Sequence, residues 1–380
     1  MSISRLTFSF DSSGWLYVYH LGVAHYLQRH VLPHLEAERV AFSGSSGGAL
    51  VAAALAGGID IEQLAHHVIG CHGRCRFNPF RMLPAAEEAI AKYMPPDGHL
   101  MANGRLRVLL TRVRLAWMRP LFGPEAVSEF ASVAHLRQVL RASCHIPVLG
   151  GVLPYQVDHI GTSRARGASR GYDAGYYDGV FWPSVLYMWR AFDASDTLFK
   201  VSGLGWPTAH IRPPLPLPLH WVCLPPPPTT LWRLFAAGYD DAARRLHGEG
   251  GGRALPDGVR AALPPPPPAN AAPMPVWLIA LGWAHLLLLT CLFPLVPPYL
   301  ACRELLQLQG RGDSKTAVLL RRGLLLAPLL AIWPLVLAYL VTRWACGRVL
   351  RELIALHDEG QAHATATSTR DAARREAKRI

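Results

Sequence analysis

A chain of 380 residues is long enough for two ordinary domains, or for one large domain with attached segments. Only 17% of the residues are charged and the mean hydropathy is +0.18, which is unusual for a purely soluble protein. The net charge of +12 comes from dispersed basic residues without a nucleic-acid-binding motif, so it argues against nucleic acid and favours anionic lipid headgroups as partners. Seven scattered cysteines form no disulfide framework.

The first sixty residues predict the order strand, helix, strand, helix. Leu6–Phe10 alternates like a strand and is followed by a turn signal at Asp11–Gly14. Tyr17–Leu32 has the pattern of a packed helix, which we expect Pro33 to stop. A strand at Val40–Phe42 then precedes a helix at Ala49–Ala56. This order is typical of an α/β sheet with helices on its faces.

Further elements continue this pattern up to about residue 250. They are a strand at Leu106–Thr111, a helix at Val133–Ala142, a short apolar segment at Ile146–Leu153, a brief strand that ends in a sharp turn at Tyr176–Gly179, and a helix at Leu231–Leu246. A basic insertion at 163–171 and a proline-rich stretch at 212–228 lie between them. No internal repeat is present.

The turn between the second strand and the second helix carries a G-x-S-x-G motif in one register only, with Gly44, Ser46 and Gly48. A serine at the apex of a strand-to-helix turn is exposed on a strained backbone and faces a helix N-terminus, which favours developing negative charge. The motif therefore predicts a nucleophile at Ser46. The alternative is an ordinary Gly/Ser turn before an alanine-rich helix.

A serine hydroxyl needs a positioned base to act as a nucleophile at neutral pH. An α/β-hydrolase would supply a late histidine, for which His210, His220 and His247 are the candidates, although none has a distinctive context. The other possibility is a two-residue site in which an aspartate alone accepts the proton. The residues themselves leave both architectures open.

A metal or other cofactor is not expected. Cys71, His72 and Cys75 lie close in sequence, but no second pair of ligands follows at a suitable spacing.

Two long apolar segments lie near the C-terminus. Val276–Leu300 and Gly323–Thr342 contain no Asp, Glu, Lys or Arg, and about 20 helical residues span roughly 30 Å of hydrocarbon. They predict a membrane-inserting helical hairpin. Basic residues on both sides of the second segment leave open whether the hairpin spans the bilayer or enters one leaflet.

The predicted organisation has four parts. These are a globular domain at 1–250, a proline-rich linker at 251–275, two apolar helices at 276–344 and a basic, partly disordered tail at 345–380. Met1–Phe10 lacks the features of a signal peptide, so we expect the globular domain on the cytosolic side.

Several stretches together resemble the patatin-like phospholipases, and most of all the adipose triglyceride lipase branch of that family. The three that match its main motifs are FDSSGWLYVYHLGVAHYL at Phe10–Leu27, FSGSSGGAL at Phe42–Leu50 and YYDGVFWPS at Tyr176–Ser184. Segments 104–113, 140–154 and 238–246 also look like that branch, in family order. The resemblance covers roughly residues 5–246.

The resemblance implies a three-layer α/β/α sandwich and a Ser-Asp dyad. Ser46 matches the nucleophile and Asp178 the aspartate that acts as general base. The remaining matches are Gly44 and Gly48 of the nucleophile elbow, Gly179 of the D-G motif, and an oxyanion hole made by the backbone N–H groups of Ser12, Ser13 and Gly14. Without the resemblance, Asp178 is an ordinary turn-capping residue before a glycine.

The sequence departs from the family pattern at three positions. Ser12 and Tyr17 stand where the family has glycines in the oxyanion loop, and Val180 stands where a small residue is usual. A side chain costs free energy at a position that needs a positive φ, so we expect a distorted or differently built oxyanion hole.

The predicted function is that of a membrane- or lipid-droplet-associated lipid acyl hydrolase, either a triacylglycerol lipase or a phospholipase. The expected partners are a glycerolipid substrate, the surface of the endoplasmic reticulum or a lipid droplet, and a protein co-activator. The alternative is a catalytically weak or inactive protein of the same fold that binds lipid surfaces or regulates a partner lipase.

Overall fold

The computed structural model describes residues 5–76, 78, 81–116, 119–146, 154–157, 175–179, 189, 192, 195–206, 208–214, 217–249 and 252–267. Contacts divide the chain into two units, Met1–Leu289 and Thr290–Ile380, and every described residue belongs to the first. The predicted hairpin at 276–344 and the tail at 345–380 lie outside the described residues. Within the described ranges, no helix is both long and apolar enough to cross a bilayer.

The described unit is built on a mixed, mostly parallel sheet. Its strands are β1 (Leu6–Phe10), β2 (Val40–Gly44), β3 (Leu106–Ala116), β4 (Arg119–Val127), β5 (Gly175–Asp178) and β6 (Thr197–Val201). Their order is β4-β3-β2-β1-β6, and β5 pairs with β3 as well. The pairs β1–β2, β1–β6 and β2–β3 are parallel, whereas β4 and β5 run antiparallel to β3.

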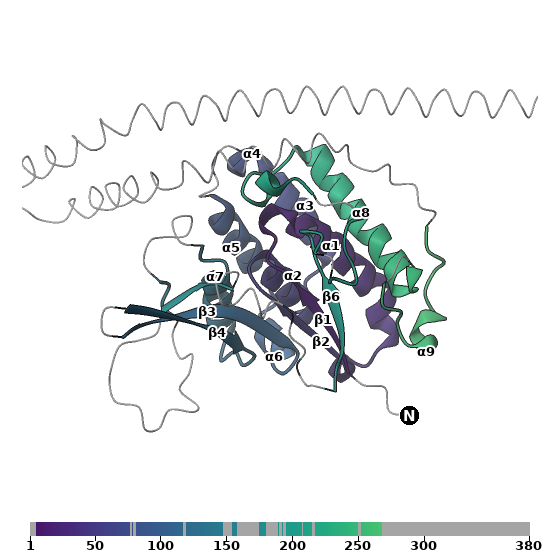
Figure 1. The fold of residues 1–380 in the computed structure, drawn as a ribbon, viewed down its shortest axis with the longest axis horizontal. Coiled ribbons are helices and arrows are strands. Elements are labelled where there is room, and N and C mark those ends of the chain that lie inside the picture. Colours follow the sequence, from purple (N-terminus) through teal and green to yellow (C-terminus); the bar gives the residue numbers. More distant parts are fainter. Residues whose placement is uncertain are drawn as a thin grey trace, which may run out of the picture. The chain divides into compact units, whose positions relative to one another are not determined.

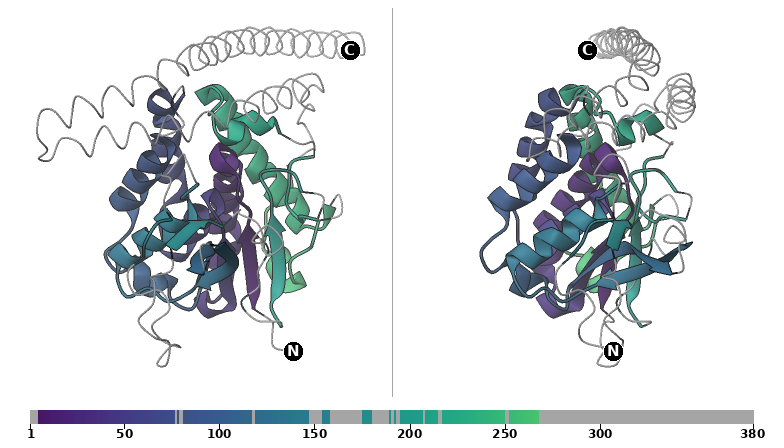
Figure 2. Two further views of the ribbon diagram at one scale, coloured as in Figure 1. Left: turned by 60° about the vertical axis from the view of Figure 1, so that its left-hand side comes forward. Right: turned by 90° about the vertical axis from the view of Figure 1, so that its left-hand side faces the viewer.

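Helices and helical turns flank this sheet (Figures 1 and 2). The α-helices are α1 (Tyr17–Tyr26), α2 (Gly47–Ala56), α3 (Ile61–Gly70), α4 (His72–Cys75), α5 (Met82–Tyr93), α6 (Gly98–Ala102), α7 (Val133–Ser143), α8 (Pro228–Leu246) and α9 (Asp257–Arg260). Shorter turns are η1 (Gly14–Leu16), η2 (Leu27–Val31), η3 (Leu32–His34), η4 (Ala37–Arg39) and η7 (Leu219–Val222). Side chains of Asp60 and Ser132 cap α3 and α7 by accepting a backbone N–H in the first turn.

Apolar packing holds the centre of the sheet. Both β1 and β2 are buried along their full length, as expected for parallel strands covered on both faces. The ring of Phe8 stacks between those of Phe42 and Phe199, at 6.3 and 5.0 Å between ring centroids. These rings join β2, β1 and β6 into one core layer.

Helices α1 and α8 lie side by side (Figures 1 and 2), and two glycines allow their close approach. A methyl group at Gly22 would collide with the carbonyl of Phe235, and one at Gly238 would collide with the carbonyl of Tyr19. The Tyr19 hydroxyl also donates a hydrogen bond to Asp241 of α8, at 2.9 Å. Helix α8 therefore closes over α1 at backbone distance.

The predicted strand, helix, strand, helix order of the first sixty residues is confirmed. The helix predicted at Tyr17–Leu32 forms as α1 followed by η2, which ends at Val31; Pro33 lies in the short turn η3, after which the chain is extended at Leu35. The strand expected at Leu106–Thr111 extends to Ala116. Strands β4 and β6 and helices α3 and α5 were not predicted.

Candidate active site

The proposed nucleophile lies between β2 and α2, where Ser46 is the N-cap residue of α2. Its backbone has φ 52° and ψ −129°, and among the described non-glycine residues Ser46 alone has a positive φ. Such a conformation costs on the order of 1–3 kcal/mol for a residue with a side chain. This is the strained strand-to-helix turn that the G-x-S-x-G motif predicts.

Gly44 and Gly48 allow this turn to fold tightly. A Cβ atom at Gly44 would lie 2.5 Å from the carbonyl carbon of Gly48, so the end of β2 touches the start of α2. A Cβ atom at Gly48 would collide with the carbonyl of Asp11, just after β1. The first turn of α2 therefore packs against the loop that carries the predicted oxyanion hole.

Strand pairing in the sheet brings the predicted base, Asp178, near the serine turn. Strand β4 pairs with β3 from Val108 to Ala116 and so occupies one edge of β3; β5 and β2 must share the other edge. On that edge Gly44 of β2 pairs with Val108, and Asp178 of β5 pairs with Leu110. Because β5 runs antiparallel, the C-terminal ends of β2 and β5 face each other, separated by two residues of β3 or about 7 Å.

The last turn of α7 and the residues after it bridge these two strand ends. The Ser143 hydroxyl accepts a hydrogen bond from the Ser46 N–H at 3.0 Å and donates one to the Leu109 carbonyl at 2.8 Å. The His145 carbonyl accepts a hydrogen bond from the Asp178 N–H at 3.0 Å. One three-residue segment, 143–145, thus holds the backbone of both Ser46 and Asp178.

Cys144 lies in the middle of this bridge. Burial raises the pKa of its thiol well above the ordinary value, and the negative charge of Asp178 raises that pKa further, as does Glu87. A hydrogen bond from the Ser46 side chain acts in the opposite direction. The thiol is therefore within electrostatic reach of both predicted dyad residues.

Asp178 and Gly179 are tightly enclosed. Asp178 has no exposed surface, and its carbonyl accepts a hydrogen bond from the Thr111 hydroxyl at 2.8 Å. A Cβ atom at Gly179 would lie 2.5 Å from the Leu109 carbonyl and 2.8 Å from the Ser45 Cβ, so the D-G turn needs glycine for close approach to the elbow. Val180 lies outside the described residues.

The predicted oxyanion loop runs between β1 and η1. Gly14 has a φ of +51°, and a Cβ atom there would collide with the carbonyl of Val222. Within the described part of the chain, the backbone N–H groups of Ser12, Ser13 and Gly14 donate to no hydrogen-bond acceptor. The Ser12 hydroxyl forms a 2.7 Å hydrogen bond with the Ser45 hydroxyl, which ties this loop to the elbow.

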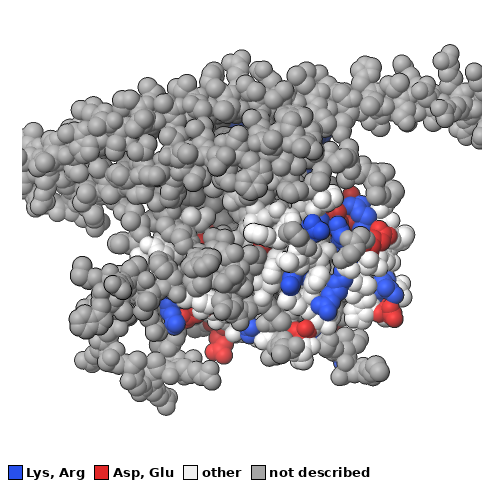
Figure 3. All heavy atoms as spheres, viewed as in Figure 1, with Lys and Arg blue, Asp and Glu red and all other residues white. Residues whose placement is uncertain are grey.

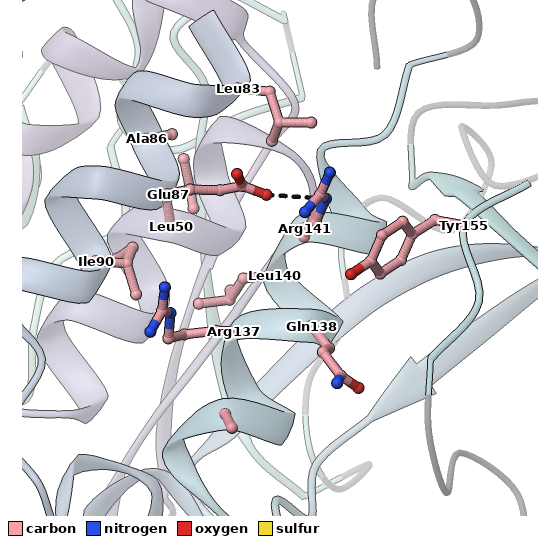
Figure 4. A pocket seen from close by; sticks show the side chains of 11 residues that line it. Leu50, Leu83, Ala86, Glu87, Ile90, Arg137, Gln138, Leu140, Arg141 and Tyr155 are labelled. Atoms are coloured by element: carbon pink, nitrogen blue, oxygen red, sulfur yellow. Dashed lines mark ion pairs between the residues drawn. The ribbon is translucent and has the colours of Figure 1, made fainter. Parts of the chain in front are cut away.

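A cavity of about 200 Å³ opens near the elbow between α2, α5 and α7 (Figure 4). Its walls are mainly apolar and include Leu50, one turn beyond Ser46 on α2. An ion pair between Glu87 and Arg141, at 2.9 Å, crosses from α5 to α7, and the Arg141 guanidinium covers the Tyr155 ring. The cavity combines an apolar wall with a polar rim.

The late histidines have other contacts. His210 Nδ1 accepts a hydrogen bond from the Lys200 N–H on β6, and His247 Nε2 contacts the Pro264 carbonyl at 3.2 Å. Neither forms a hydrogen bond with Ser46 in the described part of the chain. The geometry therefore favours an aspartate over His210 or His247 as the base; the side chain of the third candidate, His220, lies outside what the structure describes.

No group of three metal-binding side chains occurs among the residues that the structure describes. Basic and acidic side chains are intermixed over the described part of the face in Figure 3.

Comparison with known proteins shows similarity to one family. Patatin-like phospholipase domain-containing protein 2 of Mus musculus is 35% identical over 159 residues, which cover 40% of this chain and 31% of that protein. The human protein of the same name is 34% identical over 154 residues, or 38% and 29% of the two chains. Over this stretch the chain is similar to members of the patatin-like phospholipase domain family.

A third relative is named for a different activity. Human 1-acylglycerol-3-phosphate O-acyltransferase PNPLA3 is 29% identical over 154 residues, which cover 38% of this chain and 30% of that protein. The chain thus spans about 30% of the length of these curated relatives. No family model matches it.

The oxyanion loop of this patatin-like chain differs from the expectation of strain at Ser12 and Tyr17. Neither residue has a positive φ, so the side chains cause no such strain and the loop is built differently; Tyr17 has φ −61° and ψ −14° and starts helix α1. Its ring is buried instead beside the elbow, where a Cβ atom at Gly47 would lie 2.9 Å from the Tyr17 Cβ.

Sequence reasoning missed four residues that support this patatin-like site. Ser143 and Cys144 lie at the end of an ordinary amphipathic helix, and Asp11 resembles a turn residue. His20 is one of many residues on the fully packed helix α1. The position of Asp11 directly after a parallel strand was the one usable signal, since sites gather at that edge of a sheet.

The strain at Ser46 gives a stability prediction. We expect Ser46→Gly to be more stable than Ser46→Ala by about 1 kcal/mol, because glycine adopts a positive φ without a steric cost. Urea unfolding followed by tryptophan fluorescence measures the difference. At Ser45, whose φ is not positive, the order should reverse; an alanine advantage at both positions would contradict the strained turn.

The environment of Cys144 gives a second prediction, independent of activity. Asp178→Asn removes a negative charge that raises the thiol pKa, so alkylation of Cys144 by iodoacetamide at pH 8.5 should become roughly three- to tenfold faster. Ser46→Ala removes a hydrogen bond that lowers that pKa and should slow the reaction. Peptide mass spectrometry measures both rates, with buried Cys71 as the internal reference. Equal alkylation rates in the wild type and both variants would show that neither Asp178 nor Ser46 affects the Cys144 thiol.

Proposed function

We propose that this patatin-like chain is a serine lipid acyl hydrolase in which Ser46 is the nucleophile and Asp178 the general base. The observation that supports it most is the meeting of β2 and β5 on one edge of β3. There the strained serine turn and the Asp-Gly turn share one bridging segment, 143–145. A nucleophile, a carboxylate and free backbone donors then lie at one end of the sheet.

The proposed reaction has two half-reactions. Asp178 accepts the proton of the Ser46 hydroxyl as the oxygen attacks the ester carbonyl carbon of a glycerolipid. The tetrahedral intermediate collapses, the C–O bond to the alcohol breaks, and the alcohol leaves with the proton from Asp178. Water then attacks the acyl-enzyme with Asp178 as base again, and the fatty acid leaves Ser46.

The backbone N–H groups of Ser12, Ser13 and Gly14 are the proposed oxyanion donors. They have no acceptor among the described residues, and the loop that carries them packs on the first turn of α2. One such donor is worth on the order of 3 kcal/mol of transition-state stabilisation.

The proposed substrate is a glycerolipid ester, with triacylglycerol and phospholipid as the two candidates. The names of the relatives include phospholipases and one acyltransferase. Both activities pass through an acyl-enzyme, which either water or a lipid hydroxyl can discharge. No cofactor is required by this mechanism.

The remaining parts of the proposal concern the whole chain. We propose a patatin-like α/β/α domain at 1–250, a proline-rich linker at 251–275 whose first part forms α9 and contacts the domain, and a membrane-inserting hairpin at 276–344 followed by a basic tail. The hairpin would hold the domain at the endoplasmic reticulum or at a lipid droplet, with a protein co-activator as a further partner.

A second candidate function is a catalytically weak protein that binds lipid surfaces. The observation in its favour is the enclosure of the elbow, where Ser46 is only 5% exposed and the Tyr17 ring occupies the space beside Gly47.

The hydrolase proposal predicts release of fatty acid from mixed triacylglycerol and phospholipid by the full chain in microsomes. Ser46→Ala and Asp178→Asn should each lower the rate by at least about a thousandfold, because each removes one partner of the proton transfer. Gas chromatography of the released acids measures the rate, and a fluorophosphonate probe reports on Ser46 directly.

Ser128→Ala is the matched control, since it deletes a serine hydroxyl outside the candidate site and leaves the dyad and the Ser12–Ser45 hydrogen bond intact. Unchanged release in both dyad variants would refute the assignment. A folded wild-type protein that neither releases fatty acid nor reacts with the probe would favour the second candidate.

The hairpin proposal predicts that the full chain stays in the membrane pellet after alkaline carbonate extraction. Leu288→Arg combined with Leu330→Arg should shift a large share to the supernatant, because a charge near the centre of a helix costs about 3 kcal/mol of insertion free energy. Immunoblotting of both fractions gives the distribution. Release of the unaltered chain would count against insertion.

A further inference from the structure

A buried pair of titratable side chains lies directly behind the oxyanion loop. Asp11 follows β1, and its carboxylate is 1% exposed. His20 lies on α1 and has no exposed surface, and its Nε2 is 3.0 Å from Asp11 Oδ1. Neither residue has a role in the proposed proton transfer.

The Asp11 carboxylate has further donors from the segment after β6. The Ser202 hydroxyl donates a hydrogen bond to Oδ2 at 2.5 Å, and the Gly203 N–H donates one to Oδ1 at 3.2 Å. The Asp11 N–H itself donates to the Val201 carbonyl at 3.1 Å. Asp11 is therefore fixed through both its backbone and its side chain.

The same network reaches the loop through the other nitrogen of the imidazole. His20 Nδ1 lies 3.2 Å from the hydroxyl of Ser13, which is fully buried. On the opposite side of the loop, the Ser12 hydroxyl is bonded to that of Ser45. Two successive residues of the loop are thus held by their side chains, one toward α1 and one toward the elbow.

The free-energy cost of burying the Asp11 carboxylate indicates that the network has a function. A buried carboxylate destabilises the fold unless several donors compensate it, and an apolar replacement is often equally stable. The benefit expected from such a network is a fixed position. Position matters here because the proposed oxyanion donors stabilise a transition state only at the correct distance, and an error of about 1 Å costs about a hundredfold in rate.

Ser13, His20 and Asp11 are the residue types of a catalytic triad, but their placement argues against that role. All three are at most 1% exposed. Ser13 has φ −139° and precedes the short turn η1 rather than a helix with the strained backbone of Ser46. A substrate ester has no access to a hydroxyl in that environment.

We propose that Asp11 and His20 are positioning residues that hold the Ser12–Gly14 loop, through the Ser13 hydroxyl, in the geometry required for its N–H groups to bind the oxyanion. This inference rests on the proposed hydrolase function. It also accounts for the side chain at Ser12, where the family pattern has a glycine: Ser12 and its neighbour Ser13 are both anchored, and within the loop only Gly14 has a positive φ.

The test measures kcat and KM for fatty-acid release by the full chain in detergent micelles. Asp11→Ala should lower kcat about 100-fold and Ser13→Ala about tenfold, with KM changed by less than about twofold, because the ester still binds while the donors shift. The double variant should be no worse than Asp11→Ala, since both changes interrupt one network. Ser13→Ala retains its backbone N–H and serves as the test if Asp11→Ala fails to fold.

The α1–α8 contact supplies matched controls. Asp241 is equally enclosed, at 4% exposure, and accepts a hydrogen bond from Tyr19, the residue before His20. Asp241→Ala and Tyr19→Phe remove a buried carboxylate and a hydroxyl from the same helix, away from the loop. Both should keep kcat within about twofold of the wild type, even where the protein is less stable.

Hydrogen–deuterium exchange gives a readout that does not depend on activity. Asp11→Ala and Ser13→Ala should speed exchange in a peptide covering residues 11–16, and the two control variants should not. If the wild type releases no fatty acid, the hydrolase proposal fails and the exchange data alone decide whether the network holds the loop. Wild-type kcat and exchange in Asp11→Ala, or equal losses in the control variants, would overturn the inference.

Discussion

The candidate site depends on one feature of the sheet, the shared edge of β3. Strand β2 occupies the first part of that edge and β5 the next, with only Leu109 between the residues paired to Gly44 and Asp178. The Leu109 carbonyl is then used twice, as the acceptor for Ser143 and as the surface against which Gly179 packs. A parallel and an antiparallel strand that meet end to end bring two turns far apart in sequence to one place.

Side-chain contacts, rather than the glycines of the family pattern, fix the loop after β1. Glycines would permit the backbone to turn freely, whereas here hydroxyls, an imidazole and a carboxylate hold it from several sides. Helix α1 begins at Tyr17 with ordinary helical angles, and its ring fills space beside the elbow. The loop is therefore specified by contacts between side chains rather than by permissive backbone positions.

Local sequence signals predict the serine turn, whereas the other parts of the candidate site depend on contacts between distant segments. The turn at Ser46 was predictable because strand, glycines and helix are contiguous in the sequence, whereas its hydrogen bond to Ser143 comes from 97 residues away and was not. Asp178 was recognisable only through the family resemblance, because its place on the edge of β3 depends on a pairing over 68 residues of chain. The proposed role of Asp11 and His20 depends on their contacts with Ser202 and Ser13, and no sequence motif predicts these contacts. Strands β4 and β6 escaped prediction because an arginine, two prolines and a glutamate interrupt the apolar pattern of β4, and a lysine interrupts that of β6.

The segment at 143–145 has a mechanical consequence. Since Ser143 holds the Ser46 backbone and His145 holds that of Asp178, a rigid-body shift of α7 carries nucleophile and base in the same direction. The loop after β1 is held by other contacts, the Ser12–Ser45 hydrogen bond and the packing of Gly48 against the Asp11 carbonyl. One short segment therefore couples the positions of the proposed nucleophile and base, while separate contacts position the proposed oxyanion donors.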